Sequence, residues 1–259
     1  DQLVWDASLN NVLLNTSLSD DEALAQARRI VMEYKDYDSF YGNMITDEPG
    51  VTEFPALKIA AERYKKLLPD KMFYLNLFPV VATPTQLQCD SYEEYLQEYG
   101  TLGLDYICYD HYPLVGSGNN SRLVDTFLYN FQLAQDASDA SVWTFLQSMG
   151  YSGHKDPANE TDFRIQTSCA LAYGIEAVQW FCYYSPQYGG SESFDPAIIT
   201  LDGKKTEKYE YVKTINNELH ALENVYCNFR WERAMNLVGT TNTKGENPAF
   251  NYMKTDLTH

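Results

Sequence analysis

Two adjacent carboxylic acids carry the strongest chemical signal in this 259-residue sequence. Asp47 and Glu48 directly follow the apolar run Asn43–Thr46 and precede Pro49. Apolar surroundings disfavour the charged form of a carboxylic acid, so its pKa rises and it can protonate a leaving oxygen. In the alternative interpretation, one of the two acids caps the following helix or pairs with it, which Pro49 also fits. We favour the catalytic interpretation because the pair ends an apolar strand.

Polar or aromatic side chains also follow the other predicted strands. They are Asn76, Tyr109, Asp110, His111, Tyr112, Gln147, Trp180 and Tyr183. The carboxyl ends of the parallel strands of a barrel form one face, so these side chains are predicted to share a site. Asn76, His111 and Gln147 suit hydrogen bonds to hydroxyl groups. Trp180 and Tyr183 suit stacking on a sugar ring, although strand aromatics also serve as core.

The elements that position these residues follow a repeating pattern. Apolar runs lie at residues 43–46, 72–78, 105–109, 142–146 and 177–183, and their starts are 29 to 37 residues apart. Continuous apolar runs are typical of parallel strands covered on both faces. Amphipathic helical patterns lie between them, two of them behind capping boxes formed by Ser19 with Glu22 and by Ser91 with Glu94. The helix from about residue 161 is predicted to end at Gly174.

Five consecutive βα units indicate an α/β protein, either a (β/α)8 TIM-type barrel or a doubly wound sheet. No GxGxxG or GxxxxGK[ST] follows a strand, so we favour the barrel. Only one further strand, Gln2–Trp5, is convincing before residue 43. We therefore expect a barrel of residues 1–222 that lacks its first two strands. A fragment, a processed form or closure by a partner chain would explain this. Residues 223–259 are expected to be an extension or the start of another domain.

Composition excludes several classes of function. The formal charge of −17 argues against a nucleic-acid partner, which needs a basic surface. No apolar run approaches the roughly 20 residues of a membrane span. The four histidines form no HxH or HExxH pattern, so we expect neither a metal nor another cofactor. A serine hydrolase is also disfavoured because Gly-x-Ser-x-Gly is absent.

The sequence resembles glycoside hydrolases of the large clan A of barrels, especially family-42-like β-galactosidases. Residues Thr46-Asp47-Glu48-Pro49 are similar to the Asn-Glu-Pro-type motif that ends the fourth strand of that clan, with Asp47 in place of Asn. The resemblance extends over roughly residues 1–222 and includes Asn76–Pro79 and Tyr109–Pro113. It implies that Glu48 is the general acid and that the substrate is a carbohydrate. We expect a secreted or extracytoplasmic bacterial protein rather than a cytoplasmic one.

One departure from the clan concerns the second catalytic group. Retaining members carry a nucleophilic Glu at the end of the seventh strand, where this sequence has Gln147. We assign Asp110 as the substitute base or nucleophile. A carboxyl separation of about 6.5–9.5 Å from Glu48 implies inversion, and one nearer 5.5 Å implies retention. Alternatively, Asp47 orients a substrate N-acetyl group in a substrate-assisted reaction.

Two function classes follow. The first is hydrolysis of O-glycosidic bonds in an oligo- or polysaccharide. The rival is a catalytically inactive carbohydrate-binding barrel, which Gln147 favours. A barrel lyase or isomerase would need a base and usually a metal, for which the sequence offers no ligand set.

Overall fold

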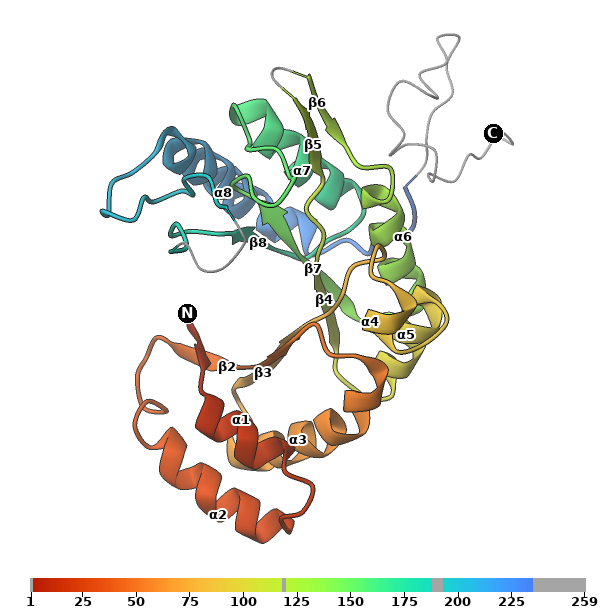
Figure 1. The fold of residues 1–259 in the computed structure, drawn as a ribbon, viewed down its shortest axis with the longest axis vertical. Helices are drawn as coiled ribbons and strands as arrows, with labels where there is room; N and C mark the ends of the chain where they lie inside the picture. Colours follow the sequence, from red (N-terminus) through yellow and green to blue (C-terminus); the bar gives the residue numbers. More distant parts are fainter. Residues whose placement is uncertain (1, 118–119, 188–192, 235–259) are drawn as a thin grey trace. The chain divides into compact units, whose positions relative to one another are not determined.

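The structure is a computed structural model that describes residues 2–117, 120–187 and 193–234. The chain divides into two compact units, one ending at Cys108 and the other beginning at Tyr109. Each unit combines strands with helices (Figure 1).

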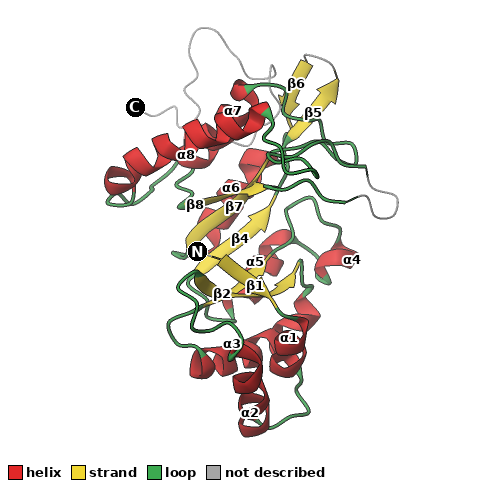
Figure 2. Ribbon diagram, turned by 90° about the vertical axis from the view of Figure 1, so that its left-hand side faces the viewer, coloured by secondary structure: helices red, strands yellow, loops and turns green. Residues whose placement is uncertain are grey.

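The first unit is built on three parallel strands in the order β1-β2-β3. The strands are β1 (Gln2–Trp5), β2 (Phe40–Asp47) and β3 (Met72–Asn76). Helices α1, α2 and α3 lie on one side of this sheet (Figures 1 and 2). The helices of this unit are α1 (Ala7–Leu14), α2 (Asp20–Val31), α3 (Phe54–Leu67), α4 (Pro84–Leu87) and α5 (Tyr92–Gly100), with a 3-10 turn, η1 (Val51–Glu53).

The predicted capping boxes set the starts of α2 and α5. Ser19 and Glu22 form the full reciprocal box before α2. Before α5 only half of the predicted box forms. The Ser91 side chain accepts the Glu94 N–H, but the Glu94 carboxylate accepts the N–H of Asp90 instead of that of Ser91. Both arrangements satisfy backbone donors that the first turn of a helix leaves open.

A buried arginine closes the side of the first unit away from the sheet. Arg63 of α3 is only 3% exposed. Its guanidinium donates to the carbonyl oxygens that end α1 and lead into α2, at Leu13, Asn15 and Leu18, and to the Asp20 carboxylate. The guanidinium uses four N–H donors in a fixed planar arrangement for these four acceptors. A lysine ammonium has only three donors and could not satisfy all of them. The contact holds α1 and α2 in place against α3.

The second unit is organised around strands β7 (Ser141–Gln147) and β8 (Ala177–Phe181), which pair in parallel. The sheet order is β4-β7-β8, and the unit boundary falls within β4 (Tyr106–Asp110). The helices are α6 (Phe127–Ala137), α7 (Glu160–Ala172) and α8 (Glu207–Tyr226). Packing of α7 and α8 on the sheet gives an apolar core that contains Phe163, Ile198, Ile199, Val212 and Ile215.

The strand positions predicted from apolar runs are confirmed, because each run coincides with or overlaps a strand of the described residues. In both larger sheets the strands follow one another in chain order without reversal. That order is typical of a barrel, whereas a doubly wound sheet reverses at a switch point. The hairpin of β5 (Leu114–Ser117) and β6 (Asn120–Leu123) was not predicted. The loss of the first two barrel strands stays a prediction.

The predicted C-terminal extension, residues 223–259, begins within α8. This helix continues past residue 222, the predicted end of the barrel, to Tyr226, and irregular chain follows to residue 234. The remainder of the predicted extension lies outside the described residues. The predicted stop of α7 is confirmed, since Gly174 follows the helix with a φ of 73°.

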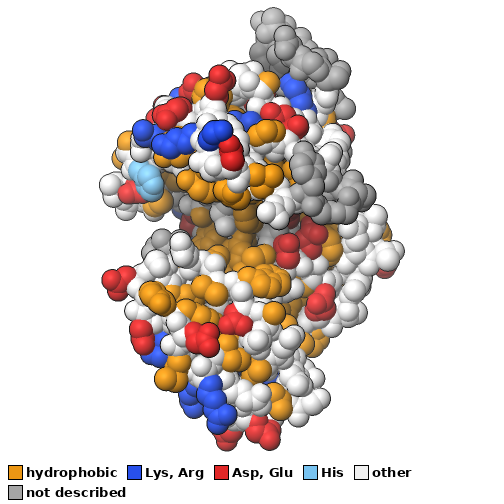
Figure 3. All heavy atoms as spheres, turned by 60° about the vertical axis from the view of Figure 1, so that its left-hand side comes forward, with side chains coloured by type: hydrophobic (Ala, Val, Ile, Leu, Met, Phe, Trp, Pro, Cys, Tyr) orange, Lys and Arg blue, Asp and Glu red, His pale blue; other side chains and the backbone are white. Residues whose placement is uncertain are grey.

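Acidic side chains are spread over the surface of both units. In the face shown in Figure 3 they lie singly or in small groups among uncharged side chains. On this face the acidic charge is therefore distributed rather than focused on one patch.

Replacement of Arg63 tests its role as an internal clamp. The Arg63→Met variant leaves buried carbonyl oxygens without donors, so we expect a loss of about 3 kcal/mol in the free energy of unfolding by urea. Arg63→Lys should recover only part of this loss. The matched control is Arg28→Met, a change at an exposed position of α2, which should stay within about 0.5 kcal/mol. Equal effects of the two methionine variants would contradict the clamp.

Candidate functional site

The carboxyl end of β2 is reshaped by an irregularity just before the acidic pair. The pairing of β2 with β3 shifts register between Met44 and Thr46. The buried Asn10 side chain of α1 donates to the carbonyl oxygens of Met44 and Ile45, at 3.0 and 2.9 Å. A bulge places an extra residue in one strand and re-aims the side chains that follow it. Asn10 therefore holds the irregular end of β2 from which Asp47 and Glu48 extend.

Glu48 has a backbone conformation that is uncommon for a residue with a side chain. Its φ is 49°, in the left-handed region. Its N–H donates to the Asn76 carbonyl at 2.8 Å, which ties it to the end of β3. Such residues cluster at functional sites, where the surrounding structure holds the strained conformation. The strand end thus fixes the backbone that carries the half-buried Glu48 side chain.

Asp47 and Asn76, two of the predicted site residues, lie beside Glu48. They are register partners on β2 and β3. The buried Asn76 amide donates to the exposed Asp47 carboxylate at 3.1 Å. Helix α3 begins at Phe54 with Glu53 at its N-cap, so neither Asp47 nor Glu48 caps it. These three residues therefore lie together at the carboxyl ends of β2 and β3, and their role in a substrate site stays a prediction.

A buried tyrosine fixes the loops that follow β2 and β3. The Tyr95 hydroxyl of α5 donates to the Pro49 carbonyl at 2.8 Å and accepts the Phe78 N–H at 3.4 Å. Burial raises the pKa of Tyr95 far above its usual value, and the nearby Glu48 charge adds to the rise. Tyr95 therefore remains a neutral hydroxyl that can donate and accept at the same time.

In the second unit, the candidates after β4 have different environments. Tyr109 is fully buried and its ring packs against Phe131 of α6, so it belongs to the core. Asp110 is half-buried at the strand end. Tyr112 is mostly buried in an aromatic cluster. Of these three residues, Asp110 is the one that has an acidic side chain and is partly exposed to solvent.

His111 is held inside the protein by helix α6. It is 3% exposed, and its two ring nitrogens contact Asn130 at 3.2 Å and Thr126 at 3.3 Å. Burial lowers the pKa of His111 to about 4, because the charged ring loses its hydration. Both ring nitrogens of His111 are engaged by side chains of this unit, so His111 offers no free nitrogen to a sugar hydroxyl.

Gln147 is also saturated by internal hydrogen bonds. The side chain is 0% exposed. Its oxygen accepts the Leu114 N–H at 3.0 Å, and its nitrogen donates to the carbonyl oxygens of Met149 and Lys155 at 3.1 and 2.8 Å. These bonds tie the loop after β4 to the loop after β7. The amide therefore cross-links loops and has no donor left for a substrate.

The two aromatic candidates at the end of β8, Trp180 within the strand and Tyr183 after it, do not lie together. The Trp180 ring packs against Phe163 of α7, and its Nε1–H donates to Asn216 of α8 at 3.0 Å. Trp180 therefore faces the helix layer. Because side chains alternate along a strand, the neighbouring Phe181 faces the other way. Tyr183 lies beyond the strand and is 60% exposed.

Sequence reasoning missed an aromatic cluster at the carboxyl ends of β4, β7 and β8. Tyr112 contacts Tyr151, His154 and Phe181, with ring centroids 5.1 to 6.1 Å apart. The Tyr151 ring stacks on His154 at 4.9 Å and on Phe194 at 6.0 Å. The segment Gly150–His154, with a tyrosine between two glycines and a histidine after the second, was the available signal.

His154 is the member of this cluster with unused hydrogen-bonding capacity. Its Nδ1 atom is buried and accepts no hydrogen bond from the described residues. Burial lowers the pKa of His154, partly offset by a hydrogen bond with the Tyr112 backbone. A neutral imidazole with a vacant acceptor can receive a hydroxyl hydrogen.

A partly buried ion pair braces the loop that carries Tyr151 and His154. The Lys208 ammonium of α8 contacts the Asp156 carboxylate, and it donates to the Pro196 carbonyl at 2.6 Å. Asp156 also accepts the Gly150 N–H at 2.9 Å. A Cβ on Gly150 would lie 2.7 Å from the Asp156 backbone nitrogen, so this close approach of the backbone requires glycine.

Two expected absences concern metals and membranes. In the described ranges, no three His, Cys, Asp or Glu side chains are grouped so that they could hold a metal ion. No helix in that part of the chain is long and apolar enough to cross a membrane.

Comparisons with known proteins identify the family. The family model of glycosyl hydrolase family 42, described as β-galactosidase, matches residues 56–222, more than half of the chain. The match begins after Glu48. No curated protein matches the sequence. The fold is similar to the crystal structure of a β-galactosidase from the psychrophilic Marinomonas ef1, with a TM-score of 0.51 and 15% identity. The similarity covers 85% of this chain but only 36% of that one.

Substitution of Gln147 by Glu tests the cross-link between the loops. The carboxylate has no hydrogens for the Met149 and Lys155 carbonyl oxygens, so we expect a loss of about 3 kcal/mol in unfolding free energy at neutral pH. Burial raises the pKa of the new acid above its unfolded value, so the loss should shrink as the pH falls towards 4. The control is Gln26→Glu on the exposed face of α2. Unchanged stability of Gln147→Glu would contradict the cross-link.

Burial of His111 predicts a pH-dependent stability. Its folded pKa of about 4 lies below the unfolded value of about 6.5, so the unfolded chain takes up the proton first. The contribution of neutral His111 to the free energy of unfolding is therefore fully present above pH 6.5. It should fall by about 3 kcal/mol between pH 6.5 and 4. The His111→Gln variant should lack this part of the profile in urea unfolding series. Parallel profiles for the two proteins would contradict the assignment.

Proposed function

Because the chain belongs to the family 42 glycosyl hydrolases, we propose that it hydrolyses O-glycosidic bonds in an oligo- or polysaccharide. The chain spans about a third of the β-galactosidase that it resembles in fold, so the activity of that whole enzyme is a proposal for this chain. The observation that carries the proposal is the left-handed backbone of Glu48 at the bulged end of β2.

In this proposal Glu48 is the general acid. It protonates the oxygen of the leaving sugar as the glycosidic bond breaks. The Glu48 side chain is half-buried, which shields it partly from water. Asn76 holds the Asp47 carboxylate, and Tyr95 holds the loop at Pro49. Strand β2 then corresponds to the fourth strand of a clan A barrel.

Asp110 is our candidate for the second carboxylate. No acid directly follows β7 or β8, where the chain continues as Gln147-Ser148-Met149 and as Cys182-Tyr183-Tyr184. Asp110 ends β4 and is half-buried. It would activate a water molecule in an inverting reaction or attack the sugar in a retaining one, depending on its separation from Glu48.

The aromatic cluster around Tyr112 and Tyr151 suits the sugar itself. Tyrosine rings combine a flat apolar face with a polar edge, which matches a pyranose ring. The vacant Nδ1 of His154 adds an acceptor for a hydroxyl group. We propose that these side chains form the sugar-binding surface of the second unit.

A second candidate function is carbohydrate binding without catalysis. It is favoured by one observation, the amide of Gln147 at the end of β7, where clan A retaining enzymes carry a nucleophilic Glu. Wild-type protein that binds sugars but releases no aglycone from any aryl glycoside would support this candidate.

The Glu48→Gln variant tests the assignment of the general acid. Removal of general acid catalysis should lower turnover of lactose by about 10² to 10⁴-fold. It should lower turnover of a dinitrophenyl galactoside much less, because that leaving group departs without protonation. The control is Glu62→Gln on the exposed side of α3. Normal lactose turnover by Glu48→Gln would reject Glu48 as the acid.

A further inference from the structure

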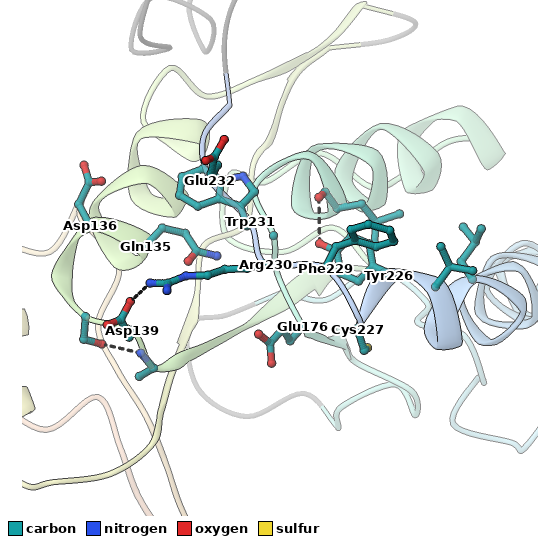
Figure 4. A pocket seen from close by; sticks show the side chains of 16 residues that line it. Gln135, Asp136, Asp139, Glu176, Tyr226, Cys227, Phe229, Arg230, Trp231 and Glu232 are labelled. Carbon is teal, nitrogen blue, oxygen red and sulfur yellow. Dashed lines mark hydrogen bonds and ion pairs between the residues drawn. The ribbon is translucent and has the colours of Figure 1, made fainter.

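The second unit contains a cavity at the opposite ends of its strands from Gln147 and Phe181. The cavity has a volume of about 710 Å³. Its lining includes residues 138–140, which lead into β7, and residues 174 and 176, which lead into β8. The rest comes from the ends of α6, α7 and α8 and from residues 227–232 (Figure 4). This volume lies within the range of known small-molecule sites.

The polar lining of the cavity consists mainly of hydrogen-bond acceptors. Asp136, Glu176 and Glu232 contribute carboxylates. The one basic side chain in the lining, Arg230, is paired with Asp139. Anionic ligands are therefore repelled, and ligands rich in hydrogen-bond donors are favoured.

One wall of the cavity is a fixed aromatic surface. The Trp231 ring stacks on Tyr173 with centroids 6.2 Å apart, and its Nε1–H donates to the Ala172 carbonyl at 3.0 Å. Gly174 makes this packing possible, because a Cβ there would lie 2.4 Å from the Trp231 Cβ. Beside it, the Phe229 ring is 76% exposed and contributes apolar surface to the cavity. Tyr226 is held by a 2.9 Å hydrogen bond to the Leu171 carbonyl.

The acceptors surround the aromatic wall rather than converge on one point. In Figure 4, Asp136 and Asp139 lie on one side, Glu232 lies near Trp231, and Glu176 lies on the side of Cys227. Glu176 already accepts a hydrogen bond from Ser141 at 2.7 Å. A single organic cation would be held best by carboxylates directed at one centre. Separate acceptors around an apolar face match a ring that carries several hydroxyl groups.

We propose that this cavity is a second, non-catalytic saccharide site. Its aromatic wall would contact the apolar face of a sugar ring, and the surrounding carboxylates would accept hydrogen bonds from the hydroxyl groups. The site lies at the amino ends of β7 and β8, whereas barrel catalysis takes place at the carboxyl ends. It would therefore hold a remote part of a polysaccharide or of its product, and it does not depend on Glu48.

The indole signal of Trp231 provides a local probe of binding. The sequence has four tryptophans, and the Trp231→Phe variant identifies its signal in a spectrum of the ¹⁵N-labelled full chain. The probes are lactose and cellobiose with sulfur-linked glycosidic bonds, which resist hydrolysis. We expect at least one of them to shift the Trp231 signal in a saturable way. The Phe229→Ala variant should raise the dissociation constant about tenfold.

The matched control is Tyr37→Ala, which removes an exposed aromatic ring from the first unit and should leave the titration unchanged. Three outcomes would overturn the proposal: no shift with either saccharide, a shift with choline alone, or an unaltered titration in Phe229→Ala. A shift that depends on protein concentration would identify an interface between copies and would also overturn it. Inactive protein that still gives the Trp231 titration would reject the proposed function and leave this site intact.

Discussion

The amide of Asn10 is the contact on which the placement of Glu48 depends. It donates to the carbonyl oxygens of Met44 and Ile45. At these residues the pairing of β2 with β3 shifts register. A shift of one residue moves every side chain of a strand to the opposite face. Asn10 stabilises this irregularity and so fixes the side of the strand end from which Glu48 extends. Arg63 in turn bonds to the Leu13 carbonyl of α1, the helix that contains Asn10.

Buried side-chain amides with several hydrogen bonds occur in both units. These amides add hydrogen bonds between segments beyond those of the regular ladders. Asn43 joins β1 to the tyrosines of the helix layer, and Gln147 joins the loops after β4 and β7. An amide has both donors and acceptors, so it can satisfy several backbone groups without a buried charge. The strand ends therefore stay rigid, as a site that orients a substrate requires.

Much of the secondary structure could be predicted from the sequence, but less of the candidate site. Apolar runs locate the strands and Ser19 locates a helix start, because both signals are local. The adjacency of Asp47, Glu48 and Asn76 also follows from strand order. The saturation of Gln147 could not be predicted, because its partners Leu114, Met149 and Lys155 lie in irregular loops or at a strand start that no local sequence pattern places beside it. A continuous apolar run likewise does not reveal which face of β8 carries Trp180 and which carries Phe181.

The central claim is that Glu48 and a second carboxylate act on one glycosidic bond. A crystal structure of the chain with a bound saccharide, measured for the separation of the Glu48 and Asp110 carboxyl groups, tests this most directly. The account predicts a separation between about 5 and 9.5 Å, with the sugar between them. Carboxyl groups more than about 15 Å apart, or a Glu48 side chain directed into solvent away from the sugar, would contradict it.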